Sequence, residues 1–487
     1  MSDLTEQTAV EVAAQVASGA VSARAVTEHF LARIERLAGP LNALLHVDRD
    51  AALAQAEAVD AKRARNEPLG RLAGVPIVVK DNLCVRGTPT TCASKILEGY
   101  VPPYDAHVIE RVKREDAVLI AKANMDEFAM GSSNENSAFG AVKNPWNHAH
   151  APGGSSGGSA AAASARLAPL TLGSDTGGSV RQPAAFCGVT AIKPTYGRVS
   201  RYGLVAFASS LDQVGPIARD VRDCARLLSV IAGFDARDAT STRRDDEDFE
   251  QGSTRSLKGQ RIGVVRGLDA AGNASSVDKA FRASLDVLRD RGAELVDVDL
   301  PHLKFAVATY YLVATAEASS NLARFDGMRF GLRVTGRDLN ETYGATRTAG
   351  FGPEVQRRIM LGTYALSAGY YDAYYLKAQK VRTLIAKDYE DAFARCDLIA
   401  TPTAPTPAFK LGEKVSDPLS MYLADIYTLP PSLAGLPSLS TPAGFSDEGL
   451  PVGLQLTGPA HAEQALIAAA YALEQATGHV RRVPPSY

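Results

Sequence analysis

The hydrophobic positions near the start of this 487-residue chain repeat with the period of a helix. Apolar side chains between residues 26 and 37 fall on one helical face, after Ser22 as a predicted N-cap and before Gly39-Pro40 as a predicted end. Residues 49–65 are rich in alanine and predict a second helix. We therefore expect roughly the first 70 residues to be mainly helical.

Short β-branched strands then alternate with helices. Continuous apolar runs at 75–80 and 117–120 predict buried strands, with a helix at 106–114 between them. The alternation continues with predicted helices at 160–165 and 277–291 and predicted strands at 169–172, 261–265 and 397–400. This pattern favours an α/β fold in which helices cover both faces of a sheet.

Polar segments interrupt this alternation at two places. Residues 124–140 are rich in turn formers, and residues 241–252 are the most charged stretch, which predicts an exposed loop. The composition does not decide whether the two halves of the chain form lobes of one sheet or separate domains.

Composition and charge narrow the class of protein. The chain is 46% hydrophobic and carries a formal net charge of −2, so it has no overall basic field for nucleic acid. Its five cysteines are odd in number and form no CxxC pair, which argues against a disulfide framework or a zinc site. The polar, acidic N-terminus and the lack of a long apolar run predict a soluble cytoplasmic protein.

Two runs rich in glycine and serine, at 152–159 and 173–183, follow the strand that ends in Lys80. The first run alone is compatible with a flexible linker, but a predicted helix and strand follow it at once. A phosphate-binding loop is a second interpretation, yet the runs lack both the Gly-Lys-Ser/Thr ending and the GxGxxG spacing.

Acyl transfer is the chemistry that these residues favour. Serine is a weak nucleophile that needs a base, and glycines let backbone N–H groups approach a reacting carbonyl as an oxyanion hole. None of the eight histidines lies in a recognisable triad motif. Lys80 ends an apolar strand; most such lysines lie at the surface, but burial would lower its pKa. A shift from about 10.4 to near neutrality corresponds to roughly 4 kcal/mol.

Three segments together resemble the amidase signature family: Lys-Asp-Asn at 80–82, the Gly/Ser run at 153–159 and the segment at 175–183. The resemblance implies one α/β domain over residues 1–487, with a large mixed sheet covered by helices on both faces. Within it we expect a helical segment at about 1–70, a core at about 71–220 and a second lobe of the same sheet at about 260–487.

The same resemblance implies a Ser-Ser-Lys catalytic triad. Ser179 is expected to be the nucleophile, and Ser155, after a cis peptide bond, to relay a proton between Ser179 and Lys80. No metal ion is expected to take part. The backbone N–H groups expected to bind the oxyanion are those of Thr176, Gly177, Gly178 and Ser179.

Further segments are similar to one branch of that family, the A subunits of glutamyl-tRNA(Gln) amidotransferases; they lie at 124–131, 193–200, 317–327 and 357–364. A local departure is Glu115-Asp116-Ala117, where many members have a glycine before the alanine. This branch implies glutamine as substrate, with Arg358 on its carboxylate and Asp425 on its amino group. Tyr310 is a further expected contact, although Tyr311 competes for its place. Without the resemblance, Arg358 would be interpreted as a helix-surface residue and Asp425 as a loop acid.

The resemblance also implies partners. We expect a heterotrimer with a tRNA-binding, kinase-like B subunit together with a small C subunit, in which B uses ATP and Mg²⁺ and makes most tRNA contacts. No cofactor is expected in this chain. The ammonia acceptor, Glu-tRNA(Gln), Asp-tRNA(Asn) or both, stays open. One alternative is a stand-alone amidase for other small amides; another is a non-catalytic scaffold, against which the complete Lys80, Ser155 and Ser179 set argues.

Overall fold

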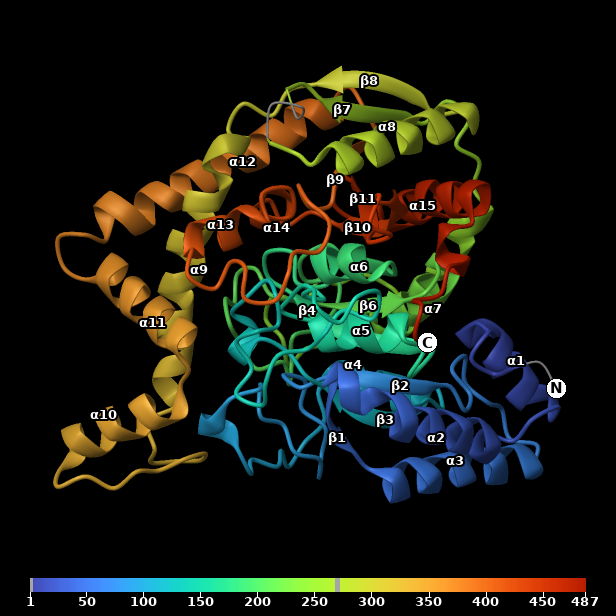
Figure 1. Cartoon of the computed structure of the whole chain (residues 1–487), viewed down its shortest axis with the longest axis horizontal. Helices are drawn as coiled ribbons and strands as arrows, with labels where there is room; N and C mark the ends of the chain where they lie inside the picture. The colour runs from blue at the N-terminus through green and yellow to red at the C-terminus, as the bar shows by residue number, and fades with distance from the viewer. Residues whose placement is uncertain (1–2, 268–271) are drawn as a thin grey trace.

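A single mixed sheet organises the molecule. The computed structural model describes residues 3–267 and 272–487, and in this part of the chain 11 strands pair in the order β1-β3-β2-β4-β6-β5-β10-β11-β9-β7-β8 (Figure 1). The strands are β1 (Leu44–Val47), β2 (Pro76–Lys80), β3 (Val118–Ala123), β4 (Leu170–Asp175), β5 (Thr190–Lys193), β6 (Gln213–Ala218), β7 (Arg261–Val265), β8 (Glu294–Val298), β9 (Leu398–Pro402), β10 (Ser438–Phe445) and β11 (Pro451–Thr457).

Helices fill the connections between the strands. They are α1 (Ala9–Ser18), α2 (Ala23–Leu41), α3 (Arg49–Ala64), α4 (His107–Arg114), α5 (Gly157–Ser164), α6 (Arg181–Cys187), α7 (Val221–Ile231), α8 (Ser275–Asp290), α9 (Ala306–Asn321), α10 (Leu339–Gly350), α11 (Pro353–Leu366), α12 (Lys377–Phe393), α13 (Pro418–Leu423), α14 (Leu429–Leu433) and α15 (Glu463–Thr477). Among the described residues, each helix is either too short or too polar to cross a bilayer.

Both faces of the sheet are covered, as the strand pattern predicts. Every residue of β2, β4 and β6 is buried. Because successive side chains of a strand point to opposite faces, a fully buried strand has packing on both sides. The α/β prediction is therefore confirmed. The predicted division of the chain into a helical segment, a core and a second lobe stays a prediction.

Parallel pairing brings the two key segments to one edge of the sheet. β2 lies between β3 and β4 and is parallel to both, so the carboxyl ends of β2 and β4, at Lys80 and Asp175, are neighbours. The Gly/Ser run that precedes α5 belongs to this centre, since every residue from 151 to 187 is buried. A flexible linker at this run is thereby excluded.

The first predicted helix begins where expected but ends later. Ser22 caps α2, because its Oγ accepts a hydrogen bond of 3.1 Å from the Ala25 N–H. The predicted end at Gly39-Pro40 is wrong, since α2 runs through Pro40 to Leu41. Pro40 lies in the last turn, where its missing N–H removes a single hydrogen bond, and Asn42 in the left-handed region ends the helix (φ 54°).

The charged stretch at 241–252 is only partly an exposed loop. The prediction is confirmed at residues 243–246, which are exposed and belong to no helix or strand, and it is wrong from Phe249 onward. Phe249 is fully buried and starts a short 3₁₀ helix (Phe249–Thr254). The acids before it find basic partners, since Asp248 pairs with Arg71 at 2.7 Å and Glu247 lies 3.4 Å from Arg198. The buried ring of Phe249 and these ion pairs therefore hold the segment against the protein, although its charged composition is typical of a segment exposed to solvent.

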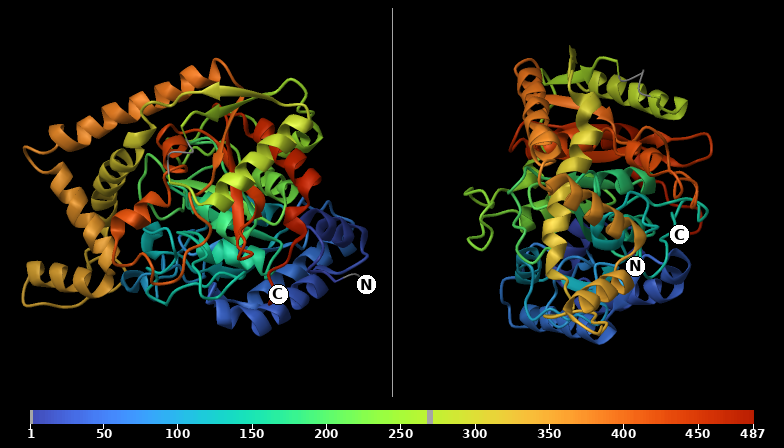
Figure 2. Two further views of the ribbon diagram at one scale, coloured as in Figure 1. Left: turned by 45° about the horizontal axis from the view of Figure 1, so that its top comes forward. Right: turned by 90° about the vertical axis from the view of Figure 1, so that its left-hand side faces the viewer.

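An outer layer of helices extends from the sheet. Figure 1 shows α9, α10, α11 and α12 at the left of the molecule, and the right-hand view of Figure 2 turns this side toward the viewer. α11 approaches α9 very closely at Gly362, where a Cβ atom would lie 1.9 Å from the Thr315 carbonyl oxygen. This contact sets the position of the α11 residues one turn earlier.

We predict that Gly362→Ala destabilises the protein, because the new methyl group meets a backbone oxygen that cannot rotate away. A loss of about 1–3 kcal/mol in unfolding free energy is expected for such overpacking, measured as a lower midpoint of thermal or urea unfolding. Gly344 in α10 is the matched control, since nothing lies within 4 Å of its would-be Cβ. Gly344→Ala should be neutral or stabilising. Equal midpoints for the two variants would contradict the packing argument.

Candidate active site

Lys80 ends β2 in a fully buried position. Its Nζ lies 2.7 Å from Ser155 Oγ and 2.8 Å from Ser156 Oγ, and 3.3 Å from the Ser174 carbonyl oxygen. Burial lowers the pKa of Lys80 to about 7, although nearby acids such as Asp126 oppose the shift. A large fraction of this amine is therefore neutral at physiological pH and able to accept a proton.

The backbone around Ser155 is held on every side. The Gly154–Ser155 peptide bond is cis. The Gly154 N–H donates to Gln182 Oε1 at 3.0 Å, and the Ser155 carbonyl accepts from the Asp126 N–H at 3.2 Å. A Cβ on Gly154 would lie 2.0 Å from Asp126 Oδ2, so only glycine fits there. These contacts aim the Ser155 hydroxyl at Lys80.

Ser179 lies between β4 and α6 and is the most accessible of the three predicted catalytic residues. It is 8% exposed, whereas Lys80 and Ser155 are wholly buried. Its carbonyl oxygen accepts a hydrogen bond of 3.1 Å from the Ser156 N–H, which joins the two Gly/Ser runs. Within the described residues its Oγ has no hydrogen-bond partner, so this hydroxyl is free to meet a ligand.

A buried ion pair shapes the turn before Ser179. Arg181 Nε and Nη2 each lie 2.9 Å from a carboxylate oxygen of Asp175. The same carboxylate accepts the N–H groups of Gly178 at 2.8 Å and Val180 at 3.2 Å. Although burial raises the pKa of Asp175, Arg181 holds it below its ordinary value. Because Gly178 already donates to Asp175, the predicted oxyanion hole relies on its other three N–H groups.

The turn packs too tightly for side chains at 177 and 178. A Cβ on Gly177 would lie 2.7 Å from the ring of Tyr310, and one on Gly178 would lie 2.2 Å from Thr428 Oγ1. Thr428 Oγ1 also donates to the Gly177 carbonyl at 2.6 Å. Tyr310, predicted as a substrate contact, therefore lies directly against the predicted oxyanion turn.

Arg358 is 3% exposed, so the interpretation as a helix-surface residue does not apply to it. Its guanidinium carbon lies 5.1 Å from the ring centre of Tyr311 and 5.6 Å from that of Tyr422, two rings that stack on each other. Its Nε donates to Glu354 Oε1 at 2.8 Å. Nη1 and Nη2 have no hydrogen-bond partner among the described residues, which leaves two parallel donors for a carboxylate.

Asp425 is also buried, in contrast to a loop acid in solvent. One carboxylate oxygen, Oδ2, accepts from the Ser132 hydroxyl, and the other, Oδ1, is buried without a partner among the described residues. Burial raises the pKa of Asp425 to about 7, while Ser132 and Arg358 counteract the shift. An unpaired buried carboxylate oxygen is costly, and a cationic N–H donor would relieve that cost.

The structure thus brings two groups of predicted residues to the same turn: the predicted catalytic residues, and the predicted substrate contacts Tyr310 and Asp425. Lys80 and Ser155 are in contact, and the N–H of the next residue, Ser156, donates to the Ser179 carbonyl. Tyr310 touches this turn, and Asp425 is linked to it because Thr428 Oγ1 donates to both the Gly177 and the Asp425 carbonyls.

Sequence reasoning missed the residues that hold this site. The Asp175–Arg181 pair had a signal, since both members belong to the segment at 175–183. Glu354 had one too, because it lies four residues before Arg358 on a helical segment. Ser156 and Asp126 had one as well, because they lie in the segments at 153–159 and 124–131. Nothing local marks the other supporting residues, which are Ser132, Tyr422 and Thr428.

In the part of the chain that the structure describes, no three His, Cys, Asp or Glu side chains are placed to hold a metal ion. His148, close to the first Gly/Ser run, instead places Nε2 3.0 Å from the Tyr487 hydroxyl.

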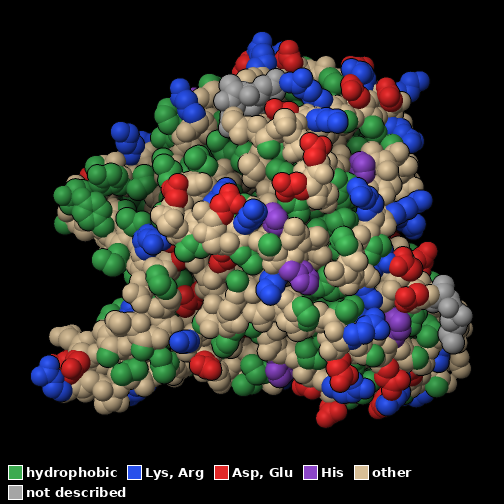
Figure 3. All heavy atoms as spheres, in the orientation of Figure 1, with side chains coloured by type: hydrophobic (Ala, Val, Ile, Leu, Met, Phe, Trp, Pro, Cys, Tyr) green, Lys and Arg blue, Asp and Glu red, His purple; other side chains and the backbone are tan. Residues whose placement is uncertain are grey.

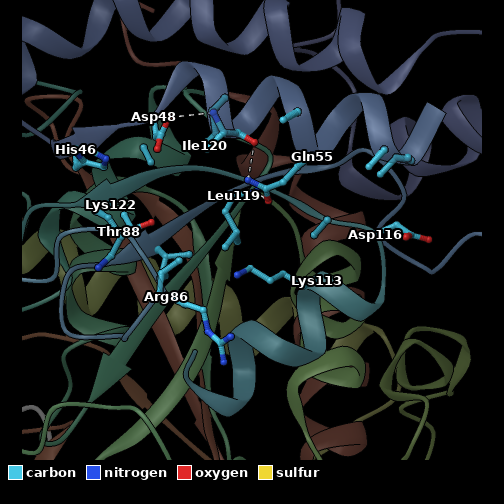
Figure 4. Close-up of a pocket in the computed structure, with 18 of the residues that line it drawn as sticks. His46, Asp48, Gln55, Arg86, Thr88, Lys113, Asp116, Leu119, Ile120 and Lys122 are labelled. Atoms are coloured by element: carbon cyan, nitrogen blue, oxygen red, sulfur yellow. Dashed lines mark hydrogen bonds between the residues drawn. The ribbon is translucent and has the colours of Figure 1, made fainter. Parts of the chain in front are cut away.

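A cavity of about 620 Å³ lies apart from these residues, between α3, β3 and α4 (Figure 4). Its wall includes Leu119 and Ile120 of β3. Two of its basic residues are already paired with acids, Lys62 with Asp116 at 2.7 Å and Lys113 with Asp105 at 2.9 Å. None of the predicted site residues lines it, so the catalytic chemistry is not located there.

Comparison with known proteins shows the family. The model of the amidase family matches residues 25–467. The A subunit of glutamyl-tRNA(Gln) amidotransferase from Moorella thermoacetica is 58% identical over 464 residues, which cover 95% of each chain. The corresponding protein from Gloeobacter violaceus, which has the same name, is 57% identical, with 97% of each chain covered.

Solved structures show the same fold. The A subunit of glutamyl-tRNA(Gln) amidotransferase from Thermotoga maritima superposes with a TM-score of 0.81 at 43% identity, covering 98% of this chain and 96% of that one. A bacterial aryl acylamidase of the amidase signature family gives a TM-score of 0.87 at 26% identity, covering 99% of both chains. The resemblance inferred from the Gly/Ser segments is confirmed, and the chain belongs to the amidase family.

Proposed function

We propose that this chain is the glutamine-hydrolysing subunit of a tRNA-dependent amidotransferase. The observation that carries the proposal is that a Lys80–Ser155–Ser179 centre lies with two sets of free polar atoms, Nη1 and Nη2 of Arg358 and Oδ1 of Asp425, among the described residues. An amino acid with a side-chain amide presents three complementary groups: a carboxylate, an ammonium and an amide. The curated relatives, named as A subunits of glutamyl-tRNA(Gln) amidotransferases, support glutamine as that amino acid.

The proposed reaction begins with attack of Ser179 Oγ on the side-chain amide carbon of glutamine. The hydroxyl proton passes through Ser155 to neutral Lys80 as the new C–O bond forms. Backbone N–H groups of Thr176, Gly177 and Ser179 stabilise the negative charge that develops on the amide oxygen.

Collapse of the tetrahedral intermediate then breaks the C–N bond. The same relay returns the proton from Lys80 to the leaving nitrogen, which departs as ammonia. A glutamyl ester of Ser179 remains, and water attacks it to release glutamate and restore the hydroxyl. The balance is glutamine plus water to glutamate plus ammonia.

The substrate ends are held by the two buried charges. Arg358 Nη1 and Nη2 bind the α-carboxylate of glutamine, and Asp425 Oδ1 accepts from its α-ammonium group. Tyr310 packs against the oxyanion turn and closes the side of the site. Because both charges are buried, an amide that lacks these ends would leave them unpaired.

Ammonia is proposed to pass to partner subunits in the cytoplasm. A tRNA-binding, kinase-like B subunit would use ATP and Mg²⁺ to activate the misacylated residue, with a small C subunit completing a heterotrimer. The net charge of −2 fits tRNA contacts that lie mainly on the partner. The aryl acylamidase at a TM-score of 0.87 keeps a second candidate open, a stand-alone amidase for other small amides.

The decisive measurement is ammonia release from glutamine by the chain alone and then with the B and C subunits, ATP and misacylated tRNA. We expect release to rise strongly only in the full mixture. Ser179→Ala should reduce it by about 10⁴-fold or more, since the nucleophile is lost, while the heterotrimer still assembles.

Ser159 provides the control for that variant. It is a buried serine of α5 whose hydroxyl donates to the Leu172 carbonyl at 3.0 Å, away from Lys80. Ser159→Ala should keep nearly full turnover. High release by the chain alone, unaffected by tRNA and ATP, would identify a stand-alone amidase instead.

We predict that kcat/KM for glutamine rises with pH through about 7 and levels off above it. Lys80 accepts a proton only when neutral, and Asp425 binds the substrate ammonium only when ionised. Burial lowers the pKa of Lys80 and raises that of Asp425, each to about 7, so on the acid side kcat/KM falls by about 10- to 100-fold per pH unit. Asp126, whose pKa burial raises to about 6, adds to the fall only at lower pH. A rate profile that stays flat between pH 6 and 8 would rule out Lys80 as the base.

Arg358→Ala should raise the KM for glutamine by about 100-fold, since a charge-assisted contact worth roughly 3 kcal/mol is lost. Turnover of a neutral amide without a carboxylate should change little. Arg357→Ala is the matched control, because that neighbouring side chain is 44% exposed. Steady-state kinetics on both substrates test the role, and equal losses on both would refute it.

A further inference from the structure

The outer side of α11 and the turn into α12 expose a group of large apolar side chains. We call it the α11–α12 patch; it consists of Met360, Leu361, Tyr364, Tyr370, Tyr371 and Tyr374, whose exposed fractions range from 39% to 73%. In Figure 3 green side chains gather on the projection at the upper left, where Figure 1 shows the α11–α12 corner. An exposed apolar group of this extent marks an interaction site more often than an ordinary surface.

The composition of the patch fits a protein partner. Between residues 360 and 376 the single charged residue is Asp372, although 22% of the chain is charged. The same 17 positions include five tyrosines, counted from the sequence. Interface cores are poor in charge and rich in tyrosine, whereas nucleic-acid surfaces need lysine and arginine for the phosphates. The patch therefore fits an apolar protein surface that offers acceptors to tyrosine hydroxyls.

The aromatic side chains are already ordered. The ring centres of Tyr364 and Tyr370 lie 4.4 Å apart, and Tyr370 and Tyr374 are 5.9 Å apart. A π-helical turn (Asp372–Leu376) fixes the backbone at this corner. A cavity of about 430 Å³ at the foot of the patch, lined in part by Tyr371, can receive a side chain of the partner. Preorganised rings lower the entropy lost on binding.

The patch lies on the outside of the helix that holds the substrate end. Met360 is two residues beyond Arg358, whose side chain is buried on the opposite side of α11. At Gly362 the same helix is pressed against α9, the helix that carries Tyr310. A partner bound to the patch would therefore touch a wall of the glutamine site directly.

We propose that the α11–α12 patch is the docking surface for the protein subunit that receives the ammonia. This inference rests on the proposed function, and it names the surface through which that function is coupled to a partner. The occupant is a different polypeptide, because the relatives are named as subunits of an amidotransferase and because the patch is poor in charge and rich in tyrosine, as interface cores between proteins are. Lysine at Met360 and Leu361 would place two charges in the interface core.

The test compares Met360→Lys/Leu361→Lys with the wild-type chain in binding to the B and C subunits, by titration and size-exclusion chromatography. We expect at least tenfold weaker binding and loss of the tRNA-stimulated ammonia release. Glutamine hydrolysis by the isolated chain and its unfolding midpoint should stay within experimental error, since both side chains face solvent. Tyr370→Lys, in the turn, is a second variant in case the double change disturbs α11.

Val101→Lys is the matched control, because Val101 and Leu361 are both 48% exposed. Its binding should stay within twofold of wild type. Three outcomes would each overturn the proposal. The patch variants could bind the subunits as tightly as the wild type, Val101→Lys could weaken binding equally, or the wild-type chain could fail to bind the subunits. Variants that assemble normally but lose self-association or tRNA binding would overturn it as well. If the wild type assembles without hydrolysing glutamine, the proposed function fails while the docking surface stands.

Discussion

The burial of one amino group, that of Lys80, is the constraint on which the rest of the site depends. Its pKa falls from 10.5 to about 7, a change that corresponds to roughly 5 kcal/mol of lost preference for the charged form. The nearest partners are neutral oxygens of Ser155, Ser156 and Ser174, which solvate the amine without holding a proton on it. A carboxylate in direct contact would keep the lysine charged. The neighbours of β2 maintain this dry environment, because β4 is fully buried and β3 is buried except at Leu119. The hydrophobic core therefore creates the environment that keeps the Lys80 amine neutral.

The second requirement is that the turn before Ser179 keeps its shape although two of its residues, Gly177 and Gly178, have no side chains to pack. Asp175 meets it by accepting two backbone N–H groups while Arg181 neutralises its charge. Such a buried ion pair adds little net stability, since desolvation offsets most of the attraction, but losing one partner would leave an uncompensated charge. Arg181 also donates to Gln455 on β11 at 2.7 Å, which ties the turn to the second half of the sheet. The geometry of the turn is therefore fixed by the whole fold.

The sequence alone predicted the parts of the site that are local. The strand that ends in Lys80 and the two Gly/Ser runs were recognisable because residues near in sequence determine them. Arg358 and Asp425 were predicted only from the resemblance. For Arg358 the reason is that Arg357 and Arg358 are adjacent on one helix, and only the packing of α11 on α9 determines which of them is buried. Phe249 shows the same limit, since a single buried ring inside a charged stretch overrides its composition. Contacts between residues far apart in the sequence determine which side chains are buried, and rules based on local sequence patterns contain no information about those contacts.

The two charges proposed to bind the substrate, Arg358 and Asp425, are linked through one carboxylate and one tyrosine. Glu354 on α11 binds Arg358 Nε and also accepts from the Tyr422 hydroxyl on α13, at 3.1 Å. Asp425 follows α13 directly, so one carboxylate connects the helix that holds the arginine with the segment that holds the aspartate. At Gly362 α11 is in close contact with α9, so the position of α11, and with it that of Arg358, depends on this packing. A packed core has discrete arrangements, so a partner that favours one of them sets the distance between the two charges.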